Sequence, residues 1–170
     1  MKTIKVAKGQ SLRSRLEALD ACSEAREWAG RKGLRTVWRT CERGDWMLWL
    51  AGRVGVDRHV FVLAACECAR LSLVHVPAGE DRPRVAIETA ERWARGDTTV
   101  SIADVRKAAH AAHAAYAAYA DADADAAYAD RSSAASGVRA ATLRLCADIV
   151  RKHITFETID AAMIAGKGET

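Results

Sequence analysis

The chain has 170 residues, 50% of them hydrophobic, and this length suits one domain with a single core. No uninterrupted apolar run approaches the ~20 residues of a membrane-spanning helix, and the basic start of the chain lacks the apolar stretch of a secretory signal. The net charge is +4, with 13 Lys or Arg against 7 Asp or Glu in residues 1–58. Such a balance suits an acidic partner but is weak for nucleic acid.

The composition favours helix almost throughout, because alanine is abundant, β-branched alternation is scarce and only two prolines occur. We therefore expect an all-α fold, a multi-helix bundle of about six to eight helices with one long Ala-rich helix. One domain is expected over residues 1–170. Its parts are a basic lead-in (1–10), Trp-rich helices (11–98), the Ala-rich helix with its continuation (101–153), and a C-terminal helix and tail (155–170).

Apolar spacing and capping residues predict the helices of the first half. These are Ser11–Ala29 closed by Gly30, Leu34–Arg43, a short helix capped by Asp45, Val60–Val74 with Asp57 as its cap candidate, and a helix that starts at Glu80–Pro83 and runs to Ala94. The segment Val60–Val74 is apolar almost all round, which predicts a central position. Within it, Glu67 and Arg70 are three positions apart, so they share a face and are expected to pair.

An alanine-rich segment dominates the second half. Ser101 and Asp104 predict a capping box at its start. Between Ala103 and Ala135, 17 of 33 residues are alanine, which predicts one long helix. A kink or loop is expected at Arg131–Gly137. A helix is expected over Val138–His153, and a short last helix over Phe156–Ala165.

Five cysteines are present, an odd number whose spacing suggests no disulfide framework. Each stands among apolar neighbours, where a reduced cysteine behaves as a small hydrophobic residue. This favours a reducing compartment, so we expect a cytoplasmic protein.

The histidines offer a candidate metal site. His110 and His113 share a face of the Ala-rich helix, and Asp121 or Cys68 would complete a ligand set on paper. Structural zinc needs four well-spaced ligands, and neither CxxC nor HExxH occurs, so we expect no metal. The run Asp121–Asp125 lacks the glycine and the closing glutamate of an EF-hand, so we interpret it as a solvated acidic face.

Catalytic motifs are not recognisable either. The sequence shows no Ser-His-Asp or Cys-His set, and Ala165–Gly168 lacks the upstream glycine of a phosphate-binding loop. We therefore expect no enzyme, no catalytic residues and no cofactor. A metal-dependent enzyme remains a hypothesis that ranks after the two functions given below. Elemental analysis of the purified protein tests it.

Five tryptophans within the first 93 residues are the most distinctive feature. Trp38 and Trp93 fit inward-facing stripes, and burial in the core is the favoured interpretation for the set. If Trp46 and Trp49 are partly exposed, they are interface anchors, since Trp and Arg are enriched there. The turn Glu80–Pro83 carries more charge than capping needs. Our hypothesis is a partner-binding edge that joins this turn to the two tryptophans, made by Asp45, Trp46, Trp49, Arg53, Asp81, Arg82, Arg84 and Glu88.

Several motifs, taken in order from about Leu12 to His153, carry a family resemblance. They are Ala21–Trp28, Cys41–Leu50, Leu63–Arg70, Asp81–Pro83, Ala86–Glu88, Glu91–Trp93, the Ala-rich helix and Cys146–Arg151. This order resembles the immunity proteins of bacterial polymorphic toxin systems, whose relatives phages also carry. The resemblance implies an all-α, non-catalytic inhibitor that binds and neutralises a toxin or effector, or a host defence component if the chain is phage-borne. The matched polar residues to test are Asp45, Glu67, Arg70, Asp81, Arg82 and Glu88.

The alternative is a nucleic-acid or nucleotide-binding regulator that uses the basic N-terminal third. Lys2, Lys5, Lys8, Arg13 and Arg15 follow one another with no acid between them, and such binding would weaken steeply with salt. A protein toxin or effector is the first expected partner and nucleic acid the second, with no membrane. The Ala-rich helix is compatible with a monomer or a homodimer.

Overall fold

A computed structural model describes residues 11–122 and 133–165, including the side chains of residues 11–113 and 137–165. The regular structure of these residues is helical, which confirms the all-α prediction. The elements are α1 (Leu12–Ala18), α2 (Ser23–Ala29), α3 (Leu34–Thr40), α4 (Gly44–Arg53), α5 (Arg58–Arg70), the 3-10 turn η1 (Leu73–His75), α6 (Arg82–Ala94), α7 (Ile102–Ala122), α9 (Ser133–His153) and α10 (Phe156–Ala165). The expected basic lead-in and the C-terminal tail after residue 165 lie outside the described residues.

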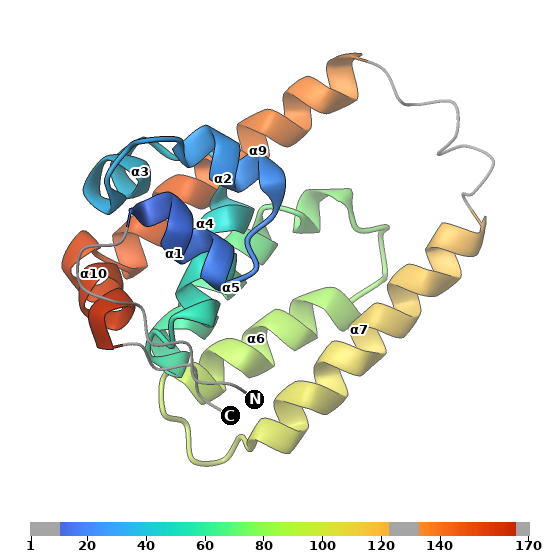
Figure 1. Ribbon diagram of the computed structural model, residues 1–170. Helices are drawn as coiled ribbons and strands as arrows, with labels where there is room; N and C mark the ends of the chain where they lie inside the picture. Colours follow the sequence, from blue (N-terminus) through green and yellow to red (C-terminus); the bar gives the residue numbers. More distant parts are fainter. Residues whose placement is uncertain (1–10, 123–132, 166–170) are drawn as a thin grey trace.

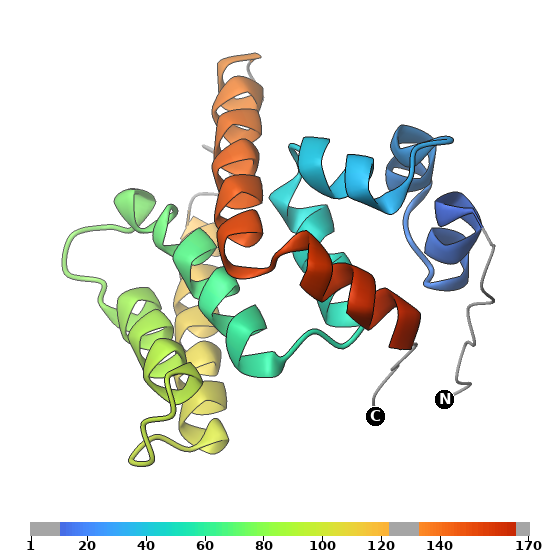
Figure 2. The same ribbon diagram turned by 90° about the vertical axis from the view of Figure 1, so that its left-hand side faces the viewer.

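Helix α5 lies at the centre of the molecule, packed against α4, α6 and α9 (Figures 1 and 2). On one side of it, α7 runs along α6. On the other side, α4 packs against α9, α10 packs against α3, and α1 packs against α2. The central position predicted for the apolar Val60–Val74 segment is therefore confirmed for its helical part.

The main core lies where α4, α5, α9 and α10 meet. Val150, Ile154 and Ile159 are fully buried there, and burying each such side chain contributes about 1.5–3 kcal/mol. Ala51 on α4 and Ala64 on α5 are also fully buried. Small side chains at these two positions let the helices approach closely.

The predicted helix Ser11–Ala29 is wrong as one element, because the chain bends between α1 and α2. Asp20 has a φ of 62°, in the left-handed region, where a right-handed helix cannot continue. Gly30, with a φ of 52°, closes α2 as predicted. This extra break helps to raise the number of α-helices in residues 11–122 and 133–165 to nine, above the expected six to eight.

Most predicted helix starts are confirmed, with one correction at α4. The Asp57 carboxylate caps α5 by accepting from the amides of His59 and Val60 at 3.0 and 3.1 Å. Helix α6 starts at the predicted turn, where Glu80 accepts from the Arg82 amide at 2.9 Å. Asp45 is not the cap of the fourth helix, since α4 begins at Gly44, one residue earlier.

The predicted capping box at the start of α7 is confirmed by reciprocal hydrogen bonds. The Ser101 amide donates to the Asp104 carboxylate at 2.9 Å, and the Asp104 amide donates to the Ser101 hydroxyl at 3.2 Å. The two residues together satisfy amides that the first turn leaves unpaired.

Three other helix ends differ from the prediction. Helix α3 ends at Thr40, before the predicted Arg43, because Cys41 is extended. Helix α5 stops at Arg70, and η1 then leaves Val74 79% exposed. The expected kink or loop at Arg131–Gly137 is wrong from Ser133 onwards, where α9 has already begun and Gly137 lies inside it. A glycine inside a helix costs only about 1 kcal/mol, which the surrounding helix can offset.

Helices α7 and α9 are separate elements that pack against different neighbours. Helix α7 lies along α6, whereas α9 lies against α4 and α5 (Figure 1). The predicted helix Ala103–Ala135 is therefore wrong as one element: its start is α7, which is described up to Ala122, and residues 133–135 belong to α9. Residues 123–132 lie outside the described part. No described helix has both the length and the apolar character needed to cross a membrane.

Candidate partner-binding pocket

An apolar pocket of about 380 Å³ opens between α1, α2, α3 and α4. Four tryptophans, Trp28, Trp38, Trp46 and Trp49, contribute to its walls, and small residues such as Ala25 also line the cavity. Binding sites for apolar groups have this character, with mostly aromatic and aliphatic walls and few polar groups.

Helix α3 forms one wall and is fixed in place by α9 and the residue after it. The buried indole of Trp38 donates from Nε1 to the Ile154 carbonyl at 3.2 Å. Arg151 donates from Nη1 to the carbonyls of Trp38 and Cys41, at 3.2 and 2.8 Å. These bonds satisfy carbonyls at the end of α3 that the helix itself leaves unpaired.

Helix α4 forms the opposite wall and is fixed at both ends. At its start, Gly44 packs so closely on α9 that a Cβ there would lie 2.4 Å from the Cβ of Cys146. At its end, the Arg53 guanidinium donates to the Leu19 carbonyl at 3.1 and 2.8 Å and to the Asp20 carboxylate at 3.2 Å. The bend between α1 and α2 is thereby tied to α4.

The tryptophans at the edge of the pocket contact one another and nearby cations. The rings of Trp28 and Trp46 are 6.2 Å apart between centroids and tilted by 59°. Lys32 lies 4.1 Å from the Trp28 ring and Arg43 lies 4.3 Å from the Trp46 ring. Each such contact is worth about 0.5–1 kcal/mol at an exposed site, so the rings are held in position. Trp49 is 36% exposed.

The polar groups beside the pocket are already paired. Arg43 donates to both carboxylate oxygens of Asp45, at 2.9 and 2.7 Å. This bidentate bond lowers the pKa of Asp45 below its usual 3.8 and raises the pKa of Arg43. Burial raises the pKa of the Cys41 thiol, which lines the pocket as a neutral group. The cavity thus offers an apolar interior beside the neutralised Arg43–Asp45 pair.

The structure brings one half of the predicted partner-binding edge together here. Asp45, Trp46 and Trp49 line the pocket, and Arg53 lies 5.7 Å from the Trp49 ring. Trp46 is half-buried, so it belongs partly to the core, as the favoured interpretation had it.

The other half of the predicted edge lies elsewhere, at the start of α6. There Arg84 pairs with Asp81 and Glu88, each at 3.0 Å, and Arg82 pairs with Glu80. Asp81 and Arg82 border a separate hollow of about 350 Å³ between α6 and α7. Because α5 lies between α4 and α6 (Figure 2), the two halves form separate groups.

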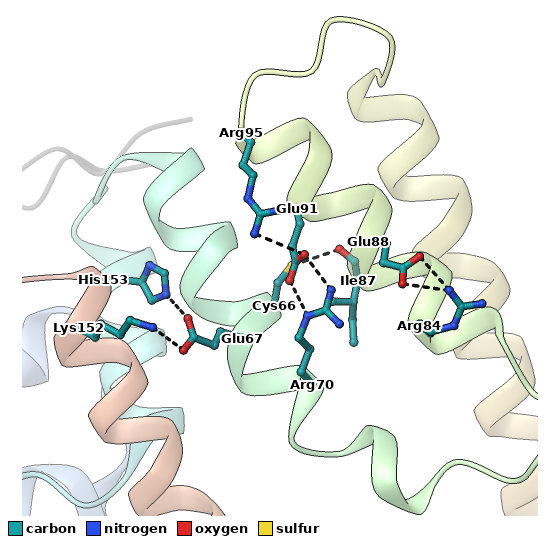
Figure 3. Close-up of polar contacts among 10 residues, drawn as sticks. All are labelled: Cys66, Glu67, Arg70, Arg84, Ile87, Glu88, Glu91, Arg95, Lys152 and His153. Atoms are coloured by element: carbon teal, nitrogen blue, oxygen red, sulfur yellow. Dashed lines mark hydrogen bonds and ion pairs between the residues drawn. The ribbon is translucent and has the colours of Figure 1, made fainter.

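Glu67 and Arg70 do not pair, contrary to the sequence-based expectation. Figure 3 shows that they turn to different neighbours of α5. Glu67 contacts Lys152 and His153 of α9, at 2.9 and 2.6 Å. Arg70 donates to both oxygens of Glu91 on α6, at 2.8 and 2.9 Å. Because α5 is central, each of the two side chains has an oppositely charged partner on a neighbouring helix. Each bonds to that partner and not to the other residue of the expected pair.

Glu91 is a buried carboxylate that sequence reasoning did not single out. It is 8% exposed, accepts the two bonds from Arg70 and lies 3.7 Å from Arg95 (Figure 3). The Arg70 hydrogen bonds lower the pKa of Glu91 below its usual 4.5. The group therefore joins α5 to α6 as a structural ion pair.

The part of the pocket wall that lies at and just before α2 was also not predicted from the sequence. Ala21 and Ala25 belong to it only because the chain bends at Asp20, and a continuous helix would place them differently. No glycine or proline marks this bend. The histidines of the candidate metal site, His110 and His113, are exposed on α7, and the described residues contain no group of three metal-binding side chains.

Comparisons of this chain with family models, with curated proteins and with solved structures find no match. The tryptophan-lined pocket and its surroundings are thus the features that a functional hypothesis has to explain.

Proposed function

We propose that this chain is a protein-binding inhibitor that takes up an apolar side chain of its partner in the tryptophan-lined pocket. In this proposal the partner is a toxin or effector protein, and binding neutralises it as an immunity protein would. The support from the sequence is the resemblance described above. The support from the structure is the pocket between α1, α2, α3 and α4.

The pocket carries the proposal because its chemistry matches an interface hot spot. Its volume of about 380 Å³ falls at the lower end of the roughly 300–1,000 Å³ found for ligand pockets. One large side chain from a partner suits a cavity of this size. Tryptophan and arginine, which dominate the edge here, are enriched among residues that contribute most to protein binding.

Filling the pocket tests the proposal. Ala25 lines the cavity from α2, and Ala25→Leu places a larger apolar side chain inside it. The variant is co-expressed with the product of the gene next to that of this protein, and the complex is purified. The matched control is Ala141→Leu, since Ala141 is exposed on α9.

We expect the wild-type chain and Ala141→Leu to bind the neighbouring gene product and to protect cells from growth arrest by it. Ala25→Leu should weaken the complex by at least about 2 kcal/mol, as expected for a hot-spot pocket, while circular dichroism stays unchanged. Full binding and protection by Ala25→Leu would contradict the use of the pocket. Failure of the wild-type chain to bind the product would contradict the proposal as a whole.

A further inference from the structure

Helix α3 has two faces of opposite character. Val37 and Trp38 are buried and line the pocket. Arg35 and Arg39, one turn apart, are exposed on the outer side. The inner face of this short helix therefore belongs to the pocket wall, and its outer face is basic and open to solvent.

Four cations gather on and just before this outer face. Arg31, Lys32, Arg35 and Arg39 fall within nine residues, 31–39, that include no acid. We call these four residues the basic face.

The side-chain contacts recorded for the basic face are with neutral groups. Lys32 donates to the Trp28 carbonyl at 2.7 Å and lies 4.1 Å from its ring. Arg35 lies 4.0 Å from the ring of Phe156 on α10. Among the described residues, Arg31 and Arg39 form no ion pair. The four positive charges therefore lack a counter-charge within the part of the chain that is described.

The arginines that flank the basic face in the sequence, Arg26 and Arg43, each have a carboxylate partner. Arg26 pairs with Glu17 at 3.2 Å and Arg43 with Asp45 at 2.7 Å. The first acid that follows the basic face, Glu42, contacts Arg144 of α9 at 2.8 Å. The charges of the basic face thus lack an ion-pair partner among the described residues, whereas those of Arg26, Arg43 and Glu42 are paired.

The basic face borders the pocket directly. Lys32 contacts the Trp28 ring, and Trp28 is one of the pocket walls. Arg35 and Arg39 stand on the same helix as Val37 and Trp38, on its opposite side. A polypeptide that places a side chain in the pocket and continues past Trp28 therefore reaches Lys32 first, and it meets Arg35 and Arg39 only if it continues across α3, a helix about 10–12 Å wide.

We infer that the basic face docks a carboxylate-rich segment of a protein partner, adjacent to the apolar side chain that enters the pocket. This inference rests on the proposed function, because it assigns both contacts to one partner. Charge complementarity of this kind accelerates encounter and excludes wrongly charged partners.

An acidic protein fits the surroundings better than a nucleic acid. Single-stranded nucleic acids bind through bases stacked on free aromatic faces. Here the rings of Trp28 and Trp46 already contact each other and a cation each. The adjoining cavity is apolar, which suits an aliphatic or aromatic side chain.

Fluorescein-labelled synthetic peptides separate the two contacts. The first peptide combines glutamates with one leucine, the second replaces glutamate by glutamine, and the third replaces the leucine by alanine. A single-stranded DNA and a DNA duplex of the same charge as the first peptide serve as further probes. Binding to the whole chain is measured by anisotropy at low salt and at about 0.15 M salt, where charges are screened beyond about 8 Å.

Variants of the chain further separate the contact with the basic face from the contact with the pocket. Arg35→Gln with Arg39→Gln removes two charges from the basic face. The matched control, Arg13→Gln with Arg106→Gln, removes two exposed charges from α1 and α7. Ala25→Leu fills the pocket.

We expect the glutamate–leucine peptide to bind at low salt, and to lose at least about tenfold in affinity, or about 1.4 kcal/mol, in the Arg35/Arg39 variant. The control pair should change the affinity by less than about twofold. Replacing glutamate by glutamine should weaken binding to wild type at low salt much more than at physiological salt.

Other outcomes overturn the inference. It fails if the glutamate and glutamine peptides bind equally, if the control pair loses as much as the Arg35/Arg39 pair, or if the acidic peptide does not bind at all. Tighter binding of either DNA than of the acidic peptide would replace it by a nucleic-acid surface. If the charge dependence holds but leucine and alanine peptides bind equally, the basic face stands and the pocket of the proposed function does not.

Discussion

Gly44 sets the distance between α4 and α9, and therefore the position of one pocket wall. A Cβ at this residue would lie 2.7 Å from the backbone N of Ala147 and from the backbone C of Cys146, in addition to its contact with the Cys146 Cβ. Backbone atoms cannot rotate away as a flexible side chain can. A side chain at this position therefore has to push the two helices apart.

We predict that Gly44→Ala lowers the free energy of unfolding by about 1–3 kcal/mol, as overpacking in a core does. Urea denaturation measures the change. The control is Gly137→Ala on α9, where a Cβ would meet nothing within 4 Å. That substitution should be stabilising by about 0.5–1 kcal/mol, since alanine favours helix over glycine. An equal effect of both substitutions would contradict the close approach at Gly44.

A second residue-scale prediction concerns the buried carboxylate Glu91. Glu91→Gln removes the charge that Arg70 binds with two hydrogen bonds. Because the Arg70 side chain is 40% exposed, we expect the free energy of unfolding to fall by about 1.5 kcal/mol at neutral pH, near the lower end of the range for charged hydrogen bonds. Chemical denaturation measures it, and Glu157→Gln on the exposed side of α10 serves as control.

The same pair predicts how stability depends on pH. The pKa of Glu91 is lowered from its usual 4.5 in the folded chain, so the unfolded chain binds this proton first as the pH falls. Its stabilising contribution is then present in full above about pH 4.5 and is lost as the pH drops through the lowered pKa. The difference in stability between wild type and Glu91→Gln should shrink over that acidic range. A difference that stays constant would show that the charge of Glu91 contributes nothing.

Among the elements, α5 depends on its cap more than a surface helix would, because three other helices pack on it. We predict that Asp57→Ala destabilises the chain by about 1 kcal/mol, the usual cost of losing an N-cap. Asp57→Asn keeps an acceptor oxygen and should change stability by only a few tenths of a kcal/mol. Thermal or urea unfolding of the three proteins measures this, and equal losses in both variants would argue for the charge of Asp57 over its capping bonds.

The existence of the helices was predictable from local signals, whereas their interruptions were not. Asp57, Ser101 and Gly30 mark helix ends by their own chemistry, and these ends are where the sequence placed them. The bend at Asp20 has no such mark, since an aspartate adopts a left-handed φ there without a neighbouring glycine or proline. The helix run from Ser133 through Gly137 shows that one glycine beside alanines does not stop a helix, since its cost there is only about 1 kcal/mol.

The candidate site was predictable only in part, for a similar reason. Asp45, Trp46 and Trp49 stand close together in sequence on one helix, so a local pattern sufficed to find them. Their separation from Asp81 and Arg84 depends on α5 lying in between, which periodicity does not reveal. The partners of Glu67 and Arg70 depend on the same packing order.

At the scale of the molecule, α5 separates two regions with different surfaces. One region, α1 to α4 with α10, holds the tryptophan-lined pocket and the basic face. The other, α6 with α7, holds the ion pairs around Arg84 and the exposed histidines. Trp93 of α6 belongs to this second region, where its ring lies 4.6 Å from that of His59. Trp93 therefore serves as a probe for binding of a partner at a site away from the pocket.

The indole N–H signals of the five tryptophans in a ¹H–¹⁵N NMR spectrum test the central claim most directly. Each signal is assigned by a Trp→Phe variant, and the chain is then titrated with the unlabelled product of the neighbouring gene. If the pocket receives the partner, the signals of Trp28, Trp46 and Trp49 shift or broaden while that of Trp93 stays in place. A shift at Trp93 with unchanged signals from Trp28, Trp46 and Trp49 would contradict the account.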